Sequence, residues 1–451
     1  MRRICLFISF LSMFTSGFAQ LSPEAKQAKK EAILAAIQLP EIPVYEVSVI
    51  NFGAKGDGKK DCKKAFDKAI QHLKKKGGGT LHVPKGTYLI NGPIHFISHF
   101  NLHLEEGAVL QFGSNPEDYP TVFTSWEGTF VYNHSPLIYG KYLTDISITG
   151  TGIIDGEASE TWLQWKPKET ADKLLSRKMN HEGTPIKDRV FGNGHYLRPQ
   201  LIQFVNSKNI LLEGVQIEDA PFWCVHLLQC ESVTLRKLTY DAHNKNNDGI
   251  DLEYTRNVLI EDIKFNNGDD NIAIKAGRDH EGRANAATPS ENILIRNCSF
   301  KGLHSLVIGS EMSAGVQDVF VENCTAHGYL KRGIYFKTNA DRGGFIKDIY
   351  IDNVSFKDTE DCFYITANYH GEGSGFNSKI KDVFISNIQC TSASGTAIVI
   401  QGYPESKVEN VQFKNIHIQK ATNGISITNT QHIDFKDVII GEAATVPTAV
   451  K

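Results

Sequence analysis

A seven-residue phrase recurs along the chain from about residue 145, and it constrains the fold more than any other feature. Each copy alternates apolar and polar residues, most copies carry a turn-forming Asn, Asp or Gly at the sixth position, and another β-prone stretch follows. Such alternation places one side of a strand in a core and the other in water. Successive full copies begin 22 to 35 residues apart, the length of one solenoid coil. The copies are Asn209–Val215, Ser232–Leu238, Asn257–Ile263, Asn292–Cys298, Asp318–Cys324, Asp348–Val354, Asp382–Ile388, Asn410–Ile416 and His432–Val438, with a fainter one at Asp145–Thr151.

These repeats predict an all-β fold, a right-handed parallel β-helix solenoid of about ten coils. A single coil cannot bury its apolar side, whereas stacked coils share a continuous core. Amphipathic helical repeats would show a period of about 3.6 residues, which these segments lack. A β-propeller is the competing all-β architecture, but its blades span about 40 residues or more.

Two helices are expected ahead of the repeats, as a cap for the open end of the solenoid. Ser22 followed by Pro23 forms a helix start that leads into the Ala-rich residues 25–37. We therefore expect a helical segment over residues 20–44 and a single β-helix domain over residues 45–445. A second helical stretch begins at Asp61 and stops at three consecutive glycines, and its apolar face comprises Ala65, Phe66, Ala69, Ile70 and Leu73.

Residues 1–19 have the three parts of a secretory signal. They begin with basic residues at Arg2–Arg3, continue through an apolar run and end in small residues at Ala19. The apolar run is shorter than the roughly 20 residues needed to span a bilayer, which argues against a membrane anchor. We expect cleavage between Ala19 and Gln20 and export to the periplasm or the medium, as a monomer without a membrane partner.

Charge and cysteine content narrow the partners further. The formal net charge of −3 gives no reason to expect a nucleic-acid partner, which would normally meet a basic face. Seven of the eight cysteines remain once Cys5 is removed with the signal. Cys298 and Cys324 occupy matching positions in consecutive repeats, so free, buried cysteines are favoured over a disulfide framework. No Cys-x-x-Cys or His-Glu-x-x-His spacing suggests a zinc site.

Two acidic stretches stand out from the repeats. Residues 246–251 read Asn-Asn-Asp-Gly-Ile-Asp, and residues 267–271 read Asn-Gly-Asp-Asp-Asn, 21 residues further on. That interval is close to one coil, so Asp248 should stack within several ångströms of Asp269 and Asp270. Carboxylates this close raise the pKa of at least one of them, which places a proton donor beside ionised carboxylates, as glycoside hydrolysis requires. Each stretch alone is also a common turn sequence.

These residues resemble the polygalacturonase family, glycoside hydrolase family 28, over most of the chain after residue 45. Asn246–Asp248 is similar to the family's Asn-Thr-Asp, and Gly268–Asp270 matches its Gly-Asp-Asp. Leu303–Ser305 resembles Gly-His-Gly with both glycines replaced. Tyr335–Lys337 resembles Arg-Ile-Lys, with Tyr where the family has Arg.

The resemblance implies an inverting mechanism without metal or organic cofactor. Asp269 would be the general acid, while Asp248 and Asp270 would hold and deprotonate a water on the opposite face of the sugar. His304 would keep the acid correctly protonated or contact the substrate.

The resemblance also implies a galacturonate-containing pectic polysaccharide or oligosaccharide as substrate. Lys337 would meet the uronate carboxylate, with help from Lys275 and Arg278 unless these are ordinary surface cations. Trp223 would stack on a sugar ring or pack in the core. Tyr335 offers one hydroxyl where Arg offers a planar fork, so the bound sugar could be plain or decorated galacturonate.

The insertion that begins at Arg278 makes the interval between Asp270 and His304 longer than its neighbours, which favours a groove closed at one end and exo action. Two other classes stay open. A pectate lyase would share the fold and use Ca²⁺ with a basic residue, and an acidic cluster could bind Ca²⁺. A non-catalytic carbohydrate-binding solenoid would show no turnover.

Overall fold

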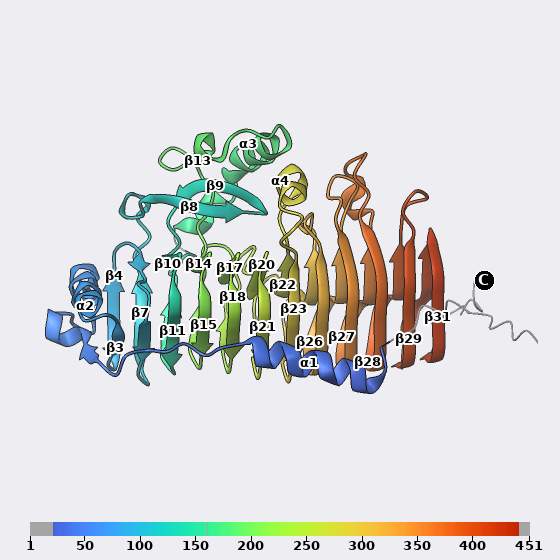
Figure 1. Ribbon diagram of the computed structural model, residues 1–451, viewed down its shortest axis with the longest axis horizontal. Helices are drawn as coiled ribbons and strands as arrows, with labels where there is room; N and C mark the ends of the chain where they lie inside the picture. The colour runs from blue at the N-terminus through green and yellow to red at the C-terminus, as the bar shows by residue number, and fades with distance from the viewer. Residues whose placement is uncertain (1–20, 160, 442–451) are drawn as a thin grey trace, which may run out of the picture.

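The computed structural model describes residues 21–159 and 161–441, and the expected secretory signal at residues 1–19 lies outside these ranges. The chain winds into an elongated stack of coils, each of which contributes strands to three sheets (Figure 1). Equivalent strands of successive coils pair in parallel and in register. The predicted parallel β-helix is therefore confirmed.

We call the three faces of the β-helix the site sheet, the flank sheet and the third sheet. The site sheet contains β5 (Ile94–His95), β10 (Ile138–Lys141), β14 (Ile202–Val205), β17 (Val225–Leu228), β20 (Ile250–Glu253), β22 (Asp270–Lys275) and β25 (His304–Gly309). The flank sheet contains β1 (Glu46–Ser48), β3 (Gly79–Val83), β6 (Phe100–Leu104), β11 (Thr144–Gly150), β15 (Lys208–Glu213), β18 (Glu231–Arg236), β21 (Arg256–Glu261) and β23 (Ser290–Arg296). The third sheet contains β2 (Asp57–Asp61), β4 (Gly86–Ile90), β7 (Ala108–Phe112), β12 (Ile153–Asp155), β16 (Gln216–Glu218), β19 (Thr239–Asp241) and β24 (Ser299–Phe300).

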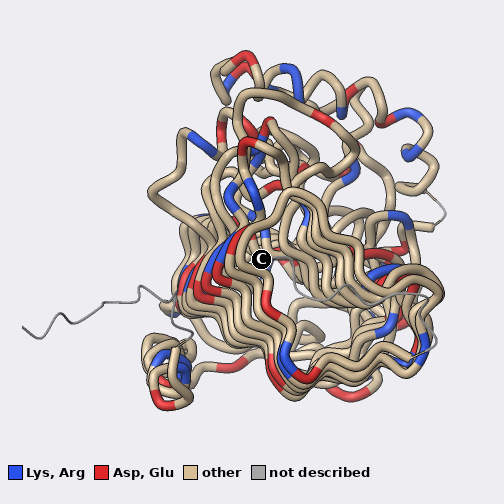
Figure 2. The backbone as a smooth tube through the Cα atoms, turned by 90° about the vertical axis from the view of Figure 1, so that its right-hand side faces the viewer, with Lys and Arg blue, Asp and Glu red and all other residues tan. Residues whose placement is uncertain are grey.

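Toward the C-terminal end the strands lengthen and bend from one sheet into the next. Viewed along the axis, the coils superpose and their charged residues form rows on the surface (Figure 2). The long strands are β26 (Val316–Lys337), β27 (Phe345–Thr366), β28 (Lys379–Gln401), β29 (Val408–Ile418), β30 (Ala421–Thr428) and β31 (Thr430–Ile440).

The first residue of the recurring phrase lies near the start of each short flank-sheet strand, and the sixth lies at its end or directly after it. In one coil these are Asn292 and Asn297, with φ of 56° and 55°. Asn tolerates this left-handed conformation better than most residues, which explains its place in the phrase. The Asn292 side chain also donates to Asn257 Oδ1 of the preceding coil at 3.1 Å.

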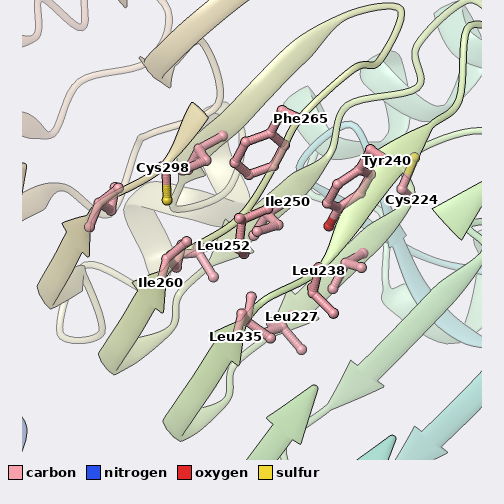
Figure 3. Close-up of a cluster of buried hydrophobic side chains, with 14 of the residues drawn as sticks. Cys224, Leu227, Leu235, Leu238, Tyr240, Ile250, Leu252, Ile260, Phe265 and Cys298 are labelled. Carbon is pink, nitrogen blue, oxygen red and sulfur yellow. The ribbon is translucent and has the colours of Figure 1, made fainter. Parts of the chain in front are cut away.

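The inward residues of successive coils stack into a continuous core. Ile250, Ile272 and Leu306 lie in register on the site sheet and are fully buried. Figure 3 shows Ile250 among other core side chains, with Tyr240 and Phe265 stacked at a centroid distance of 5.0 Å. The cysteines within the described residues are free and buried, as predicted, and they are Cys62, Cys224, Cys230, Cys298, Cys324, Cys362 and Cys390.

The two predicted N-terminal helices form, but only the second covers the end of the solenoid. Helix α1 (Pro23–Ala36) is capped by Ser22, whose Oγ accepts from the Ala25 N–H at 3.2 Å. It lies along the flank sheet instead of over the end (Figure 1), because an apolar ladder there offers it a surface. Helix α2 (Lys63–Lys75) packs on the first coil and buries its predicted apolar face. The ladder under α1 comprises Leu259, Leu294, Phe320, Tyr350 and Phe384.

Two excursions from the coils lie beside the site sheet (Figure 1). A hairpin of β8 (Thr121–Trp126) and β9 (Thr129–His134) pairs with β13 (Val190–Phe191), and helix α3 (Glu169–His181) packs on β9. Helix α4 (Asp279–Ala284) lies in the predicted insertion and contacts α3. Short 3-10 helices span Val49–Phe52, Pro116–Asp118, Trp162–Trp165, Ile186–Asp188 and Tyr369–Gly371. Within the described ranges, no helix has both the length and the apolar character needed to cross a bilayer.

Candidate active site

The site sheet turns three rows of side chains outward, and the first row carries the predicted carboxylates. Strand β20 pairs with β22, and Asp270 itself pairs with His304 of β25. The same register places Asp248 beside Asp270, and the Gly249 N–H donates to the Asp270 carbonyl oxygen at 2.8 Å. The two acidic stretches therefore stack on neighbouring coils, as their 21-residue interval predicts.

Asp270 is buried and holds a negative charge. Nδ1 of His304 lies 2.6 Å from one of its carboxylate oxygens, and the Lys337 ammonium donates to the other at 3.0 Å. Burial alone would raise the pKa of Asp270, but Lys337 and His304 hold that pKa well below the usual range of a carboxyl. Asp270 is therefore ionised at any pH near neutrality.

Asp248 and Asp269 have the opposite tendency. Burial and the neighbouring carboxylates, Asp251 first among them, raise the pKa of Asp248 well above its usual value. Burial and Asp270 raise the pKa of Asp269, while Lys337 and His304 partly oppose that shift. The cluster thus keeps a proton on a carboxyl beside the ionised Asp270. Acid–base catalysis at a glycosidic bond requires this combination of a proton donor and an ionised carboxylate.

The second outward row contains Asp251 on β20 and Tyr335 on β26. Asp251 is fully buried, and neither of its carboxylate oxygens has a hydrogen-bond partner among the described residues. Its nearest cation is Lys275, at 3.5 Å. Burial raises the pKa of Asp251 well above its usual value in spite of Lys275. Asp251 is therefore a third carboxyl, after Asp248 and Asp269, that tends to hold a proton.

The third row contains Lys275 and Lys337, and both predicted cations face the site. The Lys275 ammonium lies 3.2 Å from Glu311 Oε2 and 4.7 Å from the centre of the Trp223 ring. Burial lowers the pKa of Lys275, but Glu311 and Asp251 outweigh it and raise that pKa, so the residue stays charged. Lys275 occupies one face of the predicted Trp223 platform, whose ring also stacks on Phe222 at 5.0 Å.

A charged wall closes the site where the strands of the site sheet end. Arg278 lies 2.6 Å from Glu311 and 3.6 Å from Glu127, which sits between β8 and β9. Lys173 and Arg177 of α3 reach Glu127 at 2.9 and 3.0 Å. Burial would raise the pKa of Glu127, but these three cations lower it to about 2. The insertion at Arg278, the hairpin and α3 therefore join in one wall.

Tyr335 and Lys337 lie together at the other side of the first row. The Tyr335 ring packs edge-on against His304, with centroids 5.2 Å apart, and the Lys337 ammonium is 5.3 Å from the Tyr335 ring centre. Burial raises the pKa of Tyr335, so its hydroxyl stays neutral. Lys337 would have to share its ammonium between Asp270 and a substrate carboxylate, because it already bonds Asp270.

These residues surround a cavity of about 310 Å³. Every predicted site residue lines it except Tyr335, which lies behind Lys337 and His304. The lining residues are Glu127, Lys173, Arg177, Trp223, Asn246, Asp248, Asp269, Asp270, Lys275, Arg278, Leu303, His304, Ser310, Glu311, Lys337, Arg342, Tyr369, His370 and Glu372.

One group in the described part of the chain has the geometry of a metal site, namely Asp269, Asp270 and His304, with ligand atoms within 4.8 Å of one another. Both oxygens of Asp270 already contact His304 and Lys337. A cation would meet the Lys337 ammonium directly, and Ca²⁺ prefers six to eight oxygen ligands. The group therefore fits a metal ion poorly.

The wall contains charged residues to which the sequence pattern assigned no role. Glu127, Lys173 and Arg177 come from the excursions, more than 70 residues before Asp248, where no repeat fixes their position. Arg342 bonds the Ser310 carbonyl oxygen at 2.8 Å from the turn after β26. Glu311 lies two residues beyond β25, in a family-like Gly-Ser-Glu-Met run, but the sequence pattern assigned the side chain itself no role.

Carboxyls that hold a proton beside an ionised carboxylate are the groups that a glycoside hydrolase requires, and here a parallel β-helix presents them in one cavity. The sequence model of glycosyl hydrolases family 28 matches residues 123–439, and that of rhamnogalacturonase A/epimerase, pectate lyase-like proteins matches residues 46–109. The chain belongs to glycosyl hydrolases family 28. The resemblance noted in its motifs is thereby confirmed, and the chain is a glycoside hydrolase.

Known relatives agree with this assignment. A probable polygalacturonase of Vitis vinifera is 32% identical over 374 residues, which cover 80% of this chain and 71% of the relative. An exo-poly-alpha-D-galacturonosidase of Dickeya chrysanthemi is 25% identical over 430 residues, or 85% of this chain and 68% of the relative. The structure of a hyperthermoactive exopolygalacturonase from Thermotoga maritima superposes with a TM-score of 0.88 at 36% identity, and the match covers 92% of this chain and 96% of that one.

Proposed function

We propose that the protein is an exo-acting hydrolase of galacturonate-containing pectic chains that inverts the anomeric carbon. The observation that carries this proposal is the stack of Asp248, Asp269 and Asp270 beside a wall rich in Lys and Arg. Such cations suit the carboxylates of a uronate chain. The wall obstructs one side of the cavity, and the named activities of the Thermotoga and Dickeya relatives support exo action.

In the proposed reaction, Asp269 gives its proton to the glycosidic oxygen as the bond to the anomeric carbon breaks. Asp270, with Asp248, orients a water on the opposite face of the ring and takes one of its protons, while the water oxygen bonds to the anomeric carbon. The products are a shortened chain and a sugar of inverted configuration. His304 and Lys337 keep Asp270 ionised until the water arrives.

Digestion of oligogalacturonides tests this proposal. An exo-acting enzyme releases one small product from the first turnover, whereas a ladder of intermediate sizes would contradict exo action. Proton NMR of the first product should show the anomer opposite to that of the cleaved bond, and retention would exclude the mechanism. An unsaturated product that absorbs ultraviolet light, together with loss of activity in chelator, would identify a lyase instead.

We also propose that the protein works outside the cytoplasm, on the basis of residues 1–19. N-terminal sequencing of protein from the cell envelope or medium should begin at or near Gln20. An intact Met1 on that protein would refute export by this route.

A further inference from the structure

Two carboxylates, Glu127 and Glu311, face the cavity from its cationic wall, and the reaction does not use them. We propose that they accept hydrogen bonds from the hydroxyls of the terminal sugar, and so select chains whose non-reducing end is a saturated residue. This inference rests on the proposed exo action. It adds specificity determinants to the site and defines which pectic fragments the enzyme accepts.

Glu311 is buried and ionised, because Lys275, Arg278 and Arg342 outweigh the effect of burial and hold its pKa well below the usual range. Arg278 and the Ser310 hydroxyl donate to Oε1 at 2.6 and 2.8 Å, and Lys275 donates to Oε2 at 3.2 Å. An ionised carboxylate can accept about four hydrogen bonds. One accepting position on Oε2 is therefore left for a donor in the cavity, since no other described residue donates to it.

Glu127 is also an ionised carboxylate held by cations, and it comes from a different part of the fold. Its two oxygens meet Lys173 and Arg177 at 2.9 and 3.0 Å, and its pKa of about 2 keeps it charged. The two glutamates are joined through Arg278, which lies between them. Because both are held by cations, neither can turn away to avoid a ligand.

A sugar hydroxyl is the ligand that can donate a hydrogen bond to Glu127 and Glu311. The wall as a whole carries more cations than anions, so a uronate carboxylate finds donors there. A second carboxylate placed at Glu127 or Glu311 would be repelled, whereas a hydroxyl donates. The combination suits a uronate ring that presents its carboxylate to the cations and its free hydroxyls to the glutamates.

The non-reducing end fits this requirement better than the reducing end. A reducing terminal residue interconverts between two ring anomers and an open form, while a non-reducing ring has one fixed configuration. A rigid set of acceptors is best matched by the fixed ring. A site built to bond a hydroxyl also discriminates strongly against a ring that lacks it, because its polar groups then stay unpaired.

The 4,5-unsaturated end that a lyase leaves on a pectic fragment provides the test, because it lacks the hydroxyl at carbon 4. We compare trigalacturonate with its 4,5-unsaturated analogue and with a trimer whose reducing end has been converted to the alditol. Wild-type kcat/KM should be roughly 10- to 100-fold lower on the unsaturated trimer, the scale of one hydrogen bond to a charged group. The alditol trimer should be cleaved at nearly the normal rate.

Glu311→Gln keeps the shape of the side chain and removes its charge. In this variant, kcat/KM should fall on the saturated trimer and change little on the unsaturated one. The ratio of the two kcat/KM values should therefore narrow by about tenfold. Glu127→Gln tests the second glutamate and should narrow the same ratio. The matched control is Glu213→Gln, which changes a glutamate that is likewise held by an Arg and a Lys, Arg236 and Lys237, but lies on the flank sheet away from the cavity, and it should leave the ratio unchanged.

Equal wild-type rates on the saturated and unsaturated trimers would overturn this inference and leave exo action standing. So would a Glu311→Gln variant that slows both trimers by the same factor, the result expected if the residue only organises the cations. A large loss on the alditol trimer would assign the wall to the reducing end and also overturn it. No hydrolysis of any trimer would instead contradict the proposed function.

Discussion

The outer faces of the flank sheet and the site sheet follow the same coil register but are covered in different ways. On the flank sheet, stacked rings such as Phe320 and Tyr350, with centroids 4.9 Å apart, lie under the amphipathic helix α1. Ion pairs at the rim, such as Lys30 with Glu322 at 2.7 Å, are partly exposed. On the site sheet, the matching outward rows hold Asp and Lys residues around a cavity.

The difference teaches how one scaffold separates stability from chemistry. Burial of apolar surface stabilises the folded chain, whereas crowding of buried carboxyls such as Asp248 and Asp251, whose pKa values it raises, opposes folding. The strands hold the apolar side chains of the flank sheet and the carboxyls of the site sheet in place through the same in-register pairing. We therefore expect substitutions on the site sheet to change rates, and substitutions on the flank sheet to change the free energy of unfolding.

The largest effect is expected from Asp269→Asn. The amide keeps the size of the side chain but cannot donate a carboxylic proton, so kcat should fall by roughly 10²- to 10⁴-fold. The denaturation midpoint should stay the same or rise, because one carboxyl leaves a repelling cluster. Asp248→Asn and Asp270→Asn should be nearly as severe, and Asp251→Asn milder. A folded Asp269→Asn variant with near-normal turnover would refute the assignment.

Phe320→Ala tests the other half of the comparison. Loss of this buried ring from beneath α1 should lower the free energy of unfolding by about 3–5 kcal/mol, as measured by denaturant unfolding. Turnover of the folded variant should not change, because the flank sheet is another face of the coil. Lys30→Ala is the matched control, and loss of its partly exposed ion pair should alter stability by less than about 1 kcal/mol. Comparable losses from both variants would show that the ladder is not the stabilising feature.

A smaller effect, with a distinctive pH signature, is expected from Lys337→Met. Loss of a charged contact to the substrate should reduce kcat/KM by roughly 10- to 100-fold. Asp270 must be ionised to act as base, and Lys337 together with His304 lowers its pKa. Without Lys337 that pKa rises, so activity should be lost at a higher pH on the acid side.

The alkaline side should move in the same direction. Asp269 must hold its proton, and Lys337 lowers the pKa of Asp269, so removal of Lys337 should raise that pKa as well. A pH profile of kcat/KM would therefore shift upward on both sides. Lys331→Met, an exposed lysine on the same strand, is the control and should leave the profile unchanged. An unshifted profile for Lys337→Met would separate this residue from the acid–base groups.

The sequence predicted the repeating part of the molecule well because coil geometry is local. The spacing between Asp248 and Asp269 fixed their proximity once each phrase was taken as one coil. Helix α1 was predicted as a helix but misplaced, since its position depends on an apolar ladder of residues between 259 and 384 that no local pattern links to it. For the same reason Glu127 and Arg177 were missed: their excursions follow no register and reach the cavity only through tertiary packing.

The smallest effect is expected at Tyr335, where the chain departs from the family's Arg. The ring contacts His304 and Lys337, and it lies behind them instead of lining the cavity. An Arg at this position would place a second cation beside Lys337 and remove the ring from the edge of His304. Tyr335→Arg should therefore lower kcat/KM by less than about tenfold, on plain oligogalacturonides and on branched pectic fragments alike, through its effect on Lys337.

Tyr335→Phe separates the hydroxyl from the ring and should retain most of the activity, because the contacts are made by the ring. A clear gain on plain oligogalacturonides from Tyr335→Arg would show that a guanidinium fork can reach the substrate from this position. A loss confined to branched fragments would instead assign Tyr335 to the recognition of a decorated sugar.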